Sequence, residues 1–465
     1  MKVFTKKEMD MTHGPMMKKI IVVALPLAIS GLLQLLFTAA DLIVVGRFSK
    51  TPDASIAAVG STNSLIHLII NLALGISVGA NVVLSQALGA GNEERANRAL
   101  HTALLLAVIC GVAMGTIGFF GARTFLGWMD SPPEVIGKST RYLKIYFLGL
   151  PANLVYNFGA AALRAKGDTA RPMIYLAIAG VLNVGLNIVL VLGGWDVAGV
   201  AVATVFSQYV SAVLLVVTLL RETGVCKLSW KKLKIHGQEL KDIIRVGVPS
   251  GLLSSCFSIS NVIIQTSING FGEILTSANS VALNIDGFLY TAMNAVSSTA
   301  LTFAGQNFGA KCYPRIKKVM WECCLLVTIV WFVLGGAILL FVEPIAGLYN
   351  SNPEVIKGAV ERLQFITPLY FLCAYNEVFV GGLRSMNRTV SPVVITLVCT
   401  CVYRIVWVFT ACRWIYKPWM LYLSYPISWV INFIFTFILF AVVYRKLVRS
   451  AKEERSEPEQ ETETE

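Results

Sequence analysis

The sequence predicts an all-α integral membrane protein with twelve transmembrane helices, built as two parallel-repeat six-helix bundles around a central cleft. The first observation is composition: 55% of the 465 residues are apolar and only 14% are charged. Twelve spans of about 21 residues need about 252 apolar residues, and the chain has about 256. A soluble domain carries roughly 25% charged residues, and disorder requires low hydrophobicity. This composition therefore excludes a disordered chain and a set of ordinary soluble domains.

The second observation is a series of long apolar runs separated by short turns rich in Gly, Asn, Pro and charge. The predicted spans are 19–45, 55–86, 97–121, 139–162, 171–193, 198–220, 243–268, 275–305, 317–341, 359–383, 391–412 and 420–444. We expect a cytoplasmic leader at 1–18, an N-lobe at 19–220, a cytoplasmic linker at 221–242 and a C-lobe at 243–445. The Glu-rich end, 446–465, is predicted to be a disordered tail.

The third observation is an internal repeat with a displacement of 220 residues. Ser131-Pro-Pro-Glu-Val-Ile136 recurs as Ser351-Asn-Pro-Glu-Val-Ile356, and Gln86-Ala-Leu-Gly-Ala90 recurs as Gln306-Asn-Phe-Gly-Ala310. Leu163-Arg164 recurs as Leu383-Arg384. Six helices per repeat is an even number, so the second copy enters the membrane from the same side as the first. The halves are therefore predicted to be parallel repeats about an axis along the membrane normal.

The positive charges support this helix count and predict an orientation. We expect a multi-pass protein of the cell inner (plasma) membrane with both termini in the cytoplasm. In that orientation, 28 of the 39 Lys and Arg residues lie on the inner side and ten on the outer side. This is the positive-inside pattern. It explains the net charge of +12 by anionic membrane lipid, so we expect no nucleic-acid partner. The ten cysteines fall mostly inside apolar runs, without a CxxC pair, and predict no disulfide framework.

One carboxylate lies well inside the first span. Asp41 follows Gln34 and Thr38 by seven and three residues, which places the three side chains on one helical face. Asn183 and Asn187 are four residues apart in the fifth span, and Thr204 lies in the sixth. A buried charge is costly in lipid, which indicates a functional group. One carboxylate with neutral oxygens suits a proton or a monovalent cation better than a divalent one. Hydrogen bonding between helices is the alternative for the Asn and Thr residues.

The second half carries two further acids, Asp286 and Glu377, and Arg404 is predicted to pair with either of them. A structural ion pair and a substrate site both fit these residues. Tyr290 and Met293 follow Asp286 by four and seven residues, and this face could bind a flat apolar cation. Packing within the bundle is the alternative for the Tyr and Met side chains.

The sequence does not match the enzyme motifs that it superficially suggests. Gly137-Lys138-Ser139 resembles the end of a phosphate loop, but proline occupies position 132, where that loop requires glycine. The chain contains neither an HExxH motif nor an acidic diphosphate–magnesium motif. We therefore expect a protein that is not an enzyme and that holds no resident cofactor.

The chain resembles the multidrug and toxic compound extrusion (MATE) family over about 17–445. The resemblance rests on the Pro26…Asp41-Leu-Ile-Val-Val-Gly-Arg47 helix, the two repeated Gln…Gly-Ala loops and the Leu163-Arg-Ala-Lys-Gly-Asp-Thr169 turn, together with Asn183…Asn187 and Gly199…Thr204. It implies export of organic cations in exchange for protons or sodium. It also implies a cation-coupling site at Asp41, Asn183, Asn187 and Thr204, in which Asp41 could ligate sodium. The position of Asn187 is often an aspartate in prokaryotic relatives, so this chain has one acid fewer.

We therefore expect a monomeric antiporter that exports amphipathic organic cations by alternating access and contacts membrane lipid. The predicted substrate-binding residues are Gln34, Thr38, Asn157, Asp286, Tyr290, Met293 and Glu377. A flippase for a lipid or lipid-linked precursor is the first alternative, although it would require a basic cleft. A membrane prenyl transferase and a pore are the others; the first requires a metal-binding acid cluster, and the second predicts flux that is independent of an opposing ion gradient.

Overall fold

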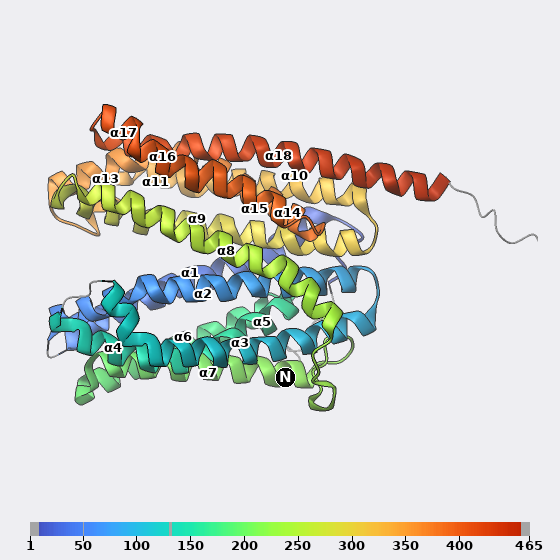
Figure 1. Cartoon of the computed structure of the whole chain (residues 1–465), viewed down its shortest axis with the longest axis horizontal. Coiled ribbons are helices and arrows are strands. Elements are labelled where there is room, and N and C mark those ends of the chain that lie inside the picture. Colours follow the sequence, from blue (N-terminus) through green and yellow to red (C-terminus); the bar gives the residue numbers. More distant parts are fainter. Residues whose placement is uncertain (1–8, 50, 130–132, 457–465) are drawn as a thin grey trace, which may run out of the picture. The chain divides into compact units, whose positions relative to one another are not determined.

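The computed structural model describes residues 9–49, 51–129 and 133–456, and every regular element in that part of the chain is a helix (Figure 1). The chain divides into two compact units. Unit 1 comprises Met1–Asp10 and Ile21–Ser258, and unit 2 comprises Met11–Ile20 and Ile259–Glu465. The division therefore falls inside two long helices, whereas the sequence placed the lobe boundary in the 221–242 linker.

Unit 1 is built from long helices that run back and forth along its length (Figure 1). They are α1 (Met16–Phe48, from residue 21 on), α2 (Pro52–Gly89), α3 (Glu93–Trp128), α4 (Pro133–Leu148), α5 (Leu150–Ala165), α6 (Ala170–Leu190), a π-helical turn (Val191–Trp195), α7 (Asp196–Arg221), a 3-10 turn (Trp230–Lys232) and α8 (Gly237–Asn269, up to Ser258). Local signals explain their ends. At the start of α3, for example, the Asn92 side chain accepts a hydrogen bond from the Arg95 backbone N–H at 2.9 Å.

Unit 2 has the same plan with more interruptions. After the end of α8, its helices are α9 (Glu273–Gly309), α10 (Tyr313–Val330), a π-helical turn (Trp331–Gly335), α11 (Gly336–Leu340), α12 (Val342–Gly347), α13 (Pro353–Ile366), a 3-10 turn (Thr367–Leu369), α14 (Tyr370–Ser385), α15 (Val390–Thr396), a π-helical turn (Leu397–Val402), α16 (Tyr403–Phe409), α17 (Ala411–Trp414) and α18 (Pro418–Ser456).

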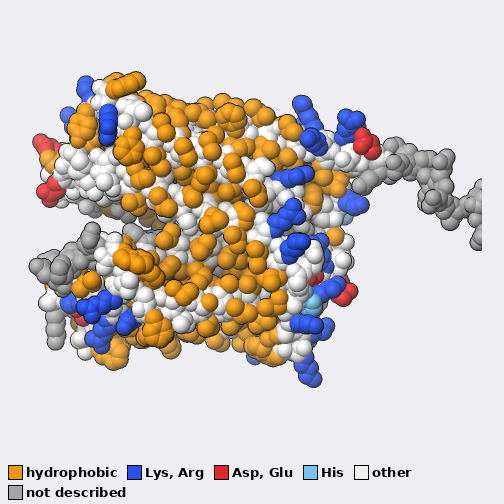
Figure 2. Space-filling model, in the orientation of Figure 1, with side chains coloured by type: hydrophobic (Ala, Val, Ile, Leu, Met, Phe, Trp, Pro, Cys, Tyr) orange, Lys and Arg blue, Asp and Glu red, His pale blue; other side chains and the backbone are white. Residues whose placement is uncertain are grey.

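The twelve predicted spans are confirmed as helical segments. Among the described residues, nine stretches are long and apolar enough to cross a membrane, and one of them, 170–221, contains two predicted spans. Gly194, with φ of 84°, breaks the helix between those two. The two remaining predicted spans correspond to α4 with α5 and to α9. Apolar side chains cover the middle length of each unit on the visible face, and Lys and Arg gather towards the ends (Figure 2).

The repeat is visible in the structure at the same displacement of 220 residues. α2 ends at Gly89 and α9 at Gly309, and each is closed by a 2.9 Å backbone bond, from Ala90 to Gln86 and from Ala310 to Gln306. The packing repeats as well. In unit 1, α2 contacts α3, α4 and α5, while α7 contacts α4 and α5. In unit 2, α9 contacts α10, α13 and α14, while α18 contacts α13 and α14.

Prolines within the predicted spans have two different effects on the helices. α1 and α8 continue through Pro26 and Pro249. The fourth span, in contrast, is interrupted at Gly149, so that Pro151 lies in the first turn of α5, and the tenth span is interrupted by the 3-10 turn that contains Pro368. Proline has no N–H and is tolerated best in a first turn. These interruptions allow one predicted span to change direction without leaving the bundle.

The C-terminal segment differs from the prediction. α18 continues to Ser456, so residues 446–456 are helical rather than disordered, and 457–465 lie outside the described residues. An ion pair between Arg449 and Glu453, four residues apart at 2.8 Å, supports the extension. All ten cysteines lie among the described residues, and none of them forms a disulfide bond there.

Candidate functional site

The predicted cation-coupling residues come together in unit 1. Asn187 Nδ2 of α6 donates a hydrogen bond to Asp41 Oδ1 of α1 at 2.5 Å. Asn183 lies one turn before Asn187 on the same helix, and its side chain is 3.3 Å from the Thr204 hydroxyl of α7. Both asparagines are buried, whereas Asp41 is half-buried. The structure therefore assembles one carboxylate, two amides and one hydroxyl from three helices.

Two local features of the sequence produce this arrangement. The four-residue spacing of Asn183 and Asn187 places both amides on one face of α6. The glycine break at Gly194 then reverses the chain, so that α7 packs against α6 and brings Thr204 alongside. On the third side, the Phe37 ring of α1 rests on Gly180 of α6, where a Cβ atom would lie only 1.8 Å from the ring. Gly180 therefore permits the close approach of α1 to α6.

The Asn183 amide provides a second donor to Asp41. With Nδ2 toward Asp41, it donates to Asp41 Oδ1 at 2.9 Å, and its oxygen accepts from the Thr204 backbone N–H at 3.3 Å. This pattern suits an ionised carboxylate, which only accepts hydrogen bonds.

The oxygen atoms also fit a monovalent cation. Asn187 Oδ1 is buried and makes no hydrogen bond, so that it is available as a neutral ligand beside the Asp41 carboxylate. Within the described residues, His, Cys, Asp and Glu side chains form no group of three or more that could hold a metal ion. A divalent ion usually takes several carboxylates. The donor set therefore favours a proton or a sodium-like cation over a divalent metal.

The predicted substrate residues of unit 1 divide into two groups. Gln34 and Thr38 are exposed on α1, on the turns that precede Asp41, and the Thr38 hydroxyl donates to the Gln34 carbonyl at 3.0 Å. Asn157 of α5 instead donates to the backbone and side-chain oxygens of Asn153 at 2.9 and 3.0 Å. Its described hydrogen bonds do not connect it to Asp41, Asn183, Asn187 and Thr204, which we call the Asp41 cluster.

In unit 2, the prediction that Arg404 pairs with an acid is wrong. Asp286 Oδ2 of α9 lies 3.0 Å from Nη1 of Arg362 in α13, and the two side chains are only 7% and 2% exposed. Arg404 Nε instead donates to the Ser428 hydroxyl at 3.0 Å, and its guanidinium lies 4.2 Å from the centre of the Tyr425 ring. Arg362 lies on the buried face of α13.

The burial of Arg362 could have been predicted from the helical pattern of its own sequence. The buried residues of α13 fall at Val355, Ala359, Arg362, Leu363 and Ile366, so the arginine occupies an apolar position in a helical pattern. A charge at such a position indicates a buried partner. Asp286 is the only acidic residue among the described residues in an ion pair with it.

The other predicted residues of unit 2 differ in accessibility. Met293 is 1% exposed and belongs to the core, so this structure does not support its role as a substrate contact. Tyr290 is 41% exposed, and its hydroxyl accepts a hydrogen bond from Asn294 at 3.0 Å. Glu377 of α14 is half-buried and interacts electrostatically with Arg384 on the same helix and with Tyr290. Within unit 2, Tyr290 is therefore the exposed aromatic residue of this set, and Glu377 is a half-buried acid.

The Leu163–Thr169 turn belongs to a buried charge cluster at one end of unit 1. Lys166 donates to Glu222 at 2.7 Å, and Arg171 binds both Glu222, at 2.8 Å, and Asp168. Burial alone would raise the pKa of Glu222, but the hydrogen bonds from Arg171 and Lys166 outweigh it and hold that pKa below its usual range. The cluster therefore joins the turn after α5 to the end of α7.

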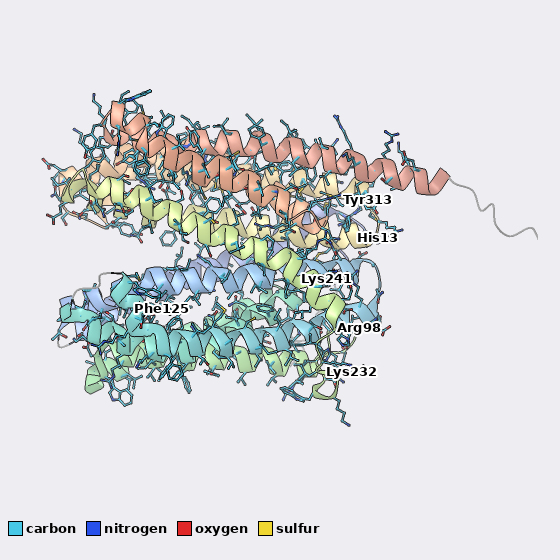
Figure 3. All side chains as sticks on the ribbon, viewed as in Figure 1. His13, Arg98, Phe125, Lys232, Lys241 and Tyr313 are labelled. Carbon is cyan, nitrogen blue, oxygen red and sulfur yellow. The ribbon has the colours of Figure 1, made fainter. Side chains whose placement is uncertain are left out.

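Both ends of the predicted linker are fixed to the same end of unit 1. Asn97 Nδ2 of α3 donates to the Val225 carbonyl at 3.1 Å, and Arg95 pairs with Asp242 at 3.0 Å. Arg98, Lys232 and Lys241 lie at this end, and Phe125 lies towards the opposite end of the unit (Figure 3). Basic residues are thus concentrated where the sequence predicted the cytoplasmic side.

Comparisons with known proteins show the family and the fold. The MatE family profile matches residues 26–189 and again 249–410, once in each repeat. The probable multidrug resistance protein YoeA of Bacillus subtilis is 28% identical over 380 residues, covering 80% of this chain and 82% of the relative. The probable multidrug resistance protein NorM of Thermotoga maritima is 26% identical over 394 residues, covering 82% of each chain. A crystal structure of MATE in complex with MaL6 superposes with a TM-score of 0.89 at 20% identity, covering 96% of this chain and all of that one, and this likeness shows the fold.

Proposed function

We propose, on the premise that the chain belongs to the MatE family of membrane transporters, that it exports amphipathic organic cations in exchange for protons or sodium ions. The observation that carries the proposal is the Asp41 cluster, in which a single carboxylate of an apolar helix is held by Asn187 and faces Asn183. Asp41 is the group that gains and loses the coupling cation. The relatives named as multidrug resistance proteins support efflux of small molecules as the direction of transport.

The hydrogen bonds that Asn183 and Asn187 donate to Asp41 supply a chemical basis for coupling. Ionised Asp41 accepts from both amides, which ties α1 to α6. When a proton or a sodium ion neutralises Asp41, the Asn183 amide must turn over or the carboxyl group must find other partners. Neutralisation therefore changes the hydrogen bonds that hold α1, and alternating access can be driven by that change.

The exchange we propose is electrically neutral when one monovalent cation leaves for each one that enters. The membrane potential is worth about 2.3 kcal/mol per charge per 100 mV, and in such an exchange this contribution cancels. The proton or sodium gradient then provides the driving force. We further propose that the protein is a monomer in the cell inner (plasma) membrane with both termini in the cytoplasm. The distribution of Lys and Arg supports this orientation.

For the substrate, we propose contacts with the accessible side chains of each unit. In unit 1, these are Gln34 and Thr38 on the exposed face of α1. In unit 2, they are Tyr290, whose ring can bind a cation on its face, and Glu377, whose carboxylate can balance the charge. Asp286 is not included, since Arg362 already neutralises it in the core.

The flippase alternative is not favoured. A lipid-linked diphosphate needs basic side chains that are available to bind it. Among the described residues, Arg362 is paired with Asp286, and Arg404 is bound to Ser428 and Tyr425.

The experiment compares ethidium efflux from vesicles by wild type and Asp41→Asn under a proton gradient and, separately, under a sodium gradient. Asparagine keeps the size of the side chain, but it carries no negative charge and therefore does not take up a proton or a sodium ion. We expect efflux driven by the effective gradient to fall at least tenfold, while Glu273→Gln, which removes an exposed acid from the first turn of α9, retains it. Full efflux by Asp41→Asn would refute the role given to this carboxylate.

A further inference from the structure

A second carboxylate of unit 1 holds the end of the helix that carries Asp41. Oδ1 of Asp196 accepts hydrogen bonds from the hydroxyl groups of Ser49 at 2.6 Å and Ser55 at 2.7 Å. Oδ2 accepts from Lys138 Nζ at 2.8 Å. Lys138 also donates to Thr51 and to Ser55. We call these five residues the Asp196 cluster; it joins the segment after α1 to α2, α4 and α7.

The backbone directs the Asp196 carboxylate into this cluster. Asp196 has φ of 50° and ψ of −136°, and it follows Gly194 with φ of 84°, so both residues have positive φ at the turn between α6 and α7. Positive φ is uncommon for residues with a Cβ atom and is enriched at Asp and Asn. The turn that places Thr204 beside Asn183 is therefore the turn that presents Asp196 to Ser49.

Much of the apolar surface of α1 is not covered by the rest of unit 1, so its polar contacts are important for its position. Large apolar side chains along it, such as Leu25, Leu36 and Ile43, are exposed. Within the described residues of unit 1, polar contacts hold α1 and the residue that follows it at three levels. Thr169 Oγ1 donates to the Val23 carbonyl at 3.0 Å, Asn187 binds Asp41, and Asp196 binds Ser49. Removing one of these three contacts therefore weakens the attachment of the adjoining part of α1 to the rest of unit 1.

We propose that Asp196 is a positioning residue of the cation site, which acts by holding Ser49 and thereby keeps Asp41 within reach of Asn187 and Asn183. Ser49 follows Asp41 by eight residues, which is about 12 Å along a helix. Ser49 N–H donates to the Val45 carbonyl at 3.1 Å, so the serine continues the hydrogen-bonding pattern of α1. Displacing Ser49 therefore displaces the turn that bears Asp41. This inference rests on the proposed function of Asp41.

The test uses Ser49→Ala, which removes the contact to α1 and leaves the bond between Lys138 and Asp196 in place. Ser49→Thr restores the hydroxyl group, and Ser77→Ala removes a hydroxyl of α2 that donates to the Leu74 carbonyl at 2.7 Å within its own helix, away from the cluster. The measurement is the pH profile of ethidium efflux from vesicles. The amide donors favour ionised Asp41. We therefore expect Ser49→Ala to move the midpoint to higher pH by about 0.5–1 unit, a roughly three- to tenfold change in proton affinity, while the other two variants keep the wild-type profile.

Asp196→Asn provides a second perturbation, which removes the charge and keeps a residue type that is enriched at positive φ. We expect the same direction of shift, and about tenfold faster hydrogen exchange in the α1 peptides around Asp41, as measured by mass spectrometry in detergent. An unchanged profile and unchanged exchange in both variants would overturn the positioning role. A lower efflux rate at every pH without a shift of the midpoint would also overturn it, since general destabilisation predicts that result.

Failure of this inference can be distinguished from failure of the proposed function. If Asp41→Asn abolishes coupled efflux while Ser49→Ala behaves as wild type, the function stands and the positioning role is wrong. If Asp41→Asn retains full efflux, the proposed function is wrong, and hydrogen exchange of α1 still shows whether Asp196 holds the helix.

Discussion

Replacing Arg362 alone should destabilise the protein far more than replacing both members of its ion pair. Arg362 and Asp286 are 2% and 7% exposed, and their charged atoms are 3.0 Å apart. In Arg362→Met, Asp286 keeps its burial and loses its neutralising partner. Breaking a buried pair in this way costs about 3–5 kcal/mol, whereas replacing both partners with apolar side chains of similar volume is often neutral or stabilising.

The magnitude can be measured by thermal unfolding in detergent. For a unit of about 200 residues, each kcal/mol shifts the midpoint temperature by about 2–4 °C. We therefore expect Arg362→Met to lower it by about 6–20 °C, and the double variant Asp286→Leu with Arg362→Met to recover most of the loss. Lys318→Met is the control within unit 2, because its pair with Glu322 at 3.6 Å is 60% exposed on the lysine side and should contribute less than about 1 kcal/mol.

The same variants separate a structural pair from a substrate site. Efflux by the stable double variant at the wild-type rate would identify the pair as a structural contact. The reasoning would be refuted if Arg362→Met unfolded at the wild-type temperature, or if the double variant were less stable than either single variant. Either result would mean that the two charges do not compensate each other in the core.

Three further predictions concern unit 1. Glu222→Gln should lower stability by about 3 kcal/mol at pH 7; because the folded-state pKa of Glu222 is depressed, this contribution is present above its unfolded pKa of about 4.3 and is lost as pH falls through the folded value, so melting temperatures of variant and wild type should converge only below that folded value. Gly180→Ala should force the Phe37 ring aside at a cost of about 1–3 kcal/mol, and adding Phe37→Ala should relieve the clash, as measured by thermal unfolding and efflux. Asn187→Asp should place a second carboxylate beside Asp41 and increase the sodium dependence of efflux; an unchanged ratio of sodium-driven to proton-driven transport would contradict that expectation.

The Asp41 cluster could be predicted from sequence because its signals are local or repeated. Apolar runs of sufficient length identify spans, since a bilayer sets the length of a helix that crosses it. The four-residue spacing of Asn183 and Asn187 assigns both to one face of a helix whatever that helix packs against. The structure confirmed that Asp41 and Thr204 meet this face, while their role in coupling stays a prediction.

What the sequence alone determined, then, is the number of helices, their repeat and the faces that carry polar groups, because helical periodicity depends only on residues a few positions apart. Tertiary structure decided which faces meet. Arg362 rather than Arg404 pairs with Asp286, and Asp196 reaches back 147 residues to Ser49. Those contacts depend on the rotation and tilt of each helix within its bundle and on the breaks at Gly149 and Gly194, which many side chains settle together and no short stretch of sequence specifies.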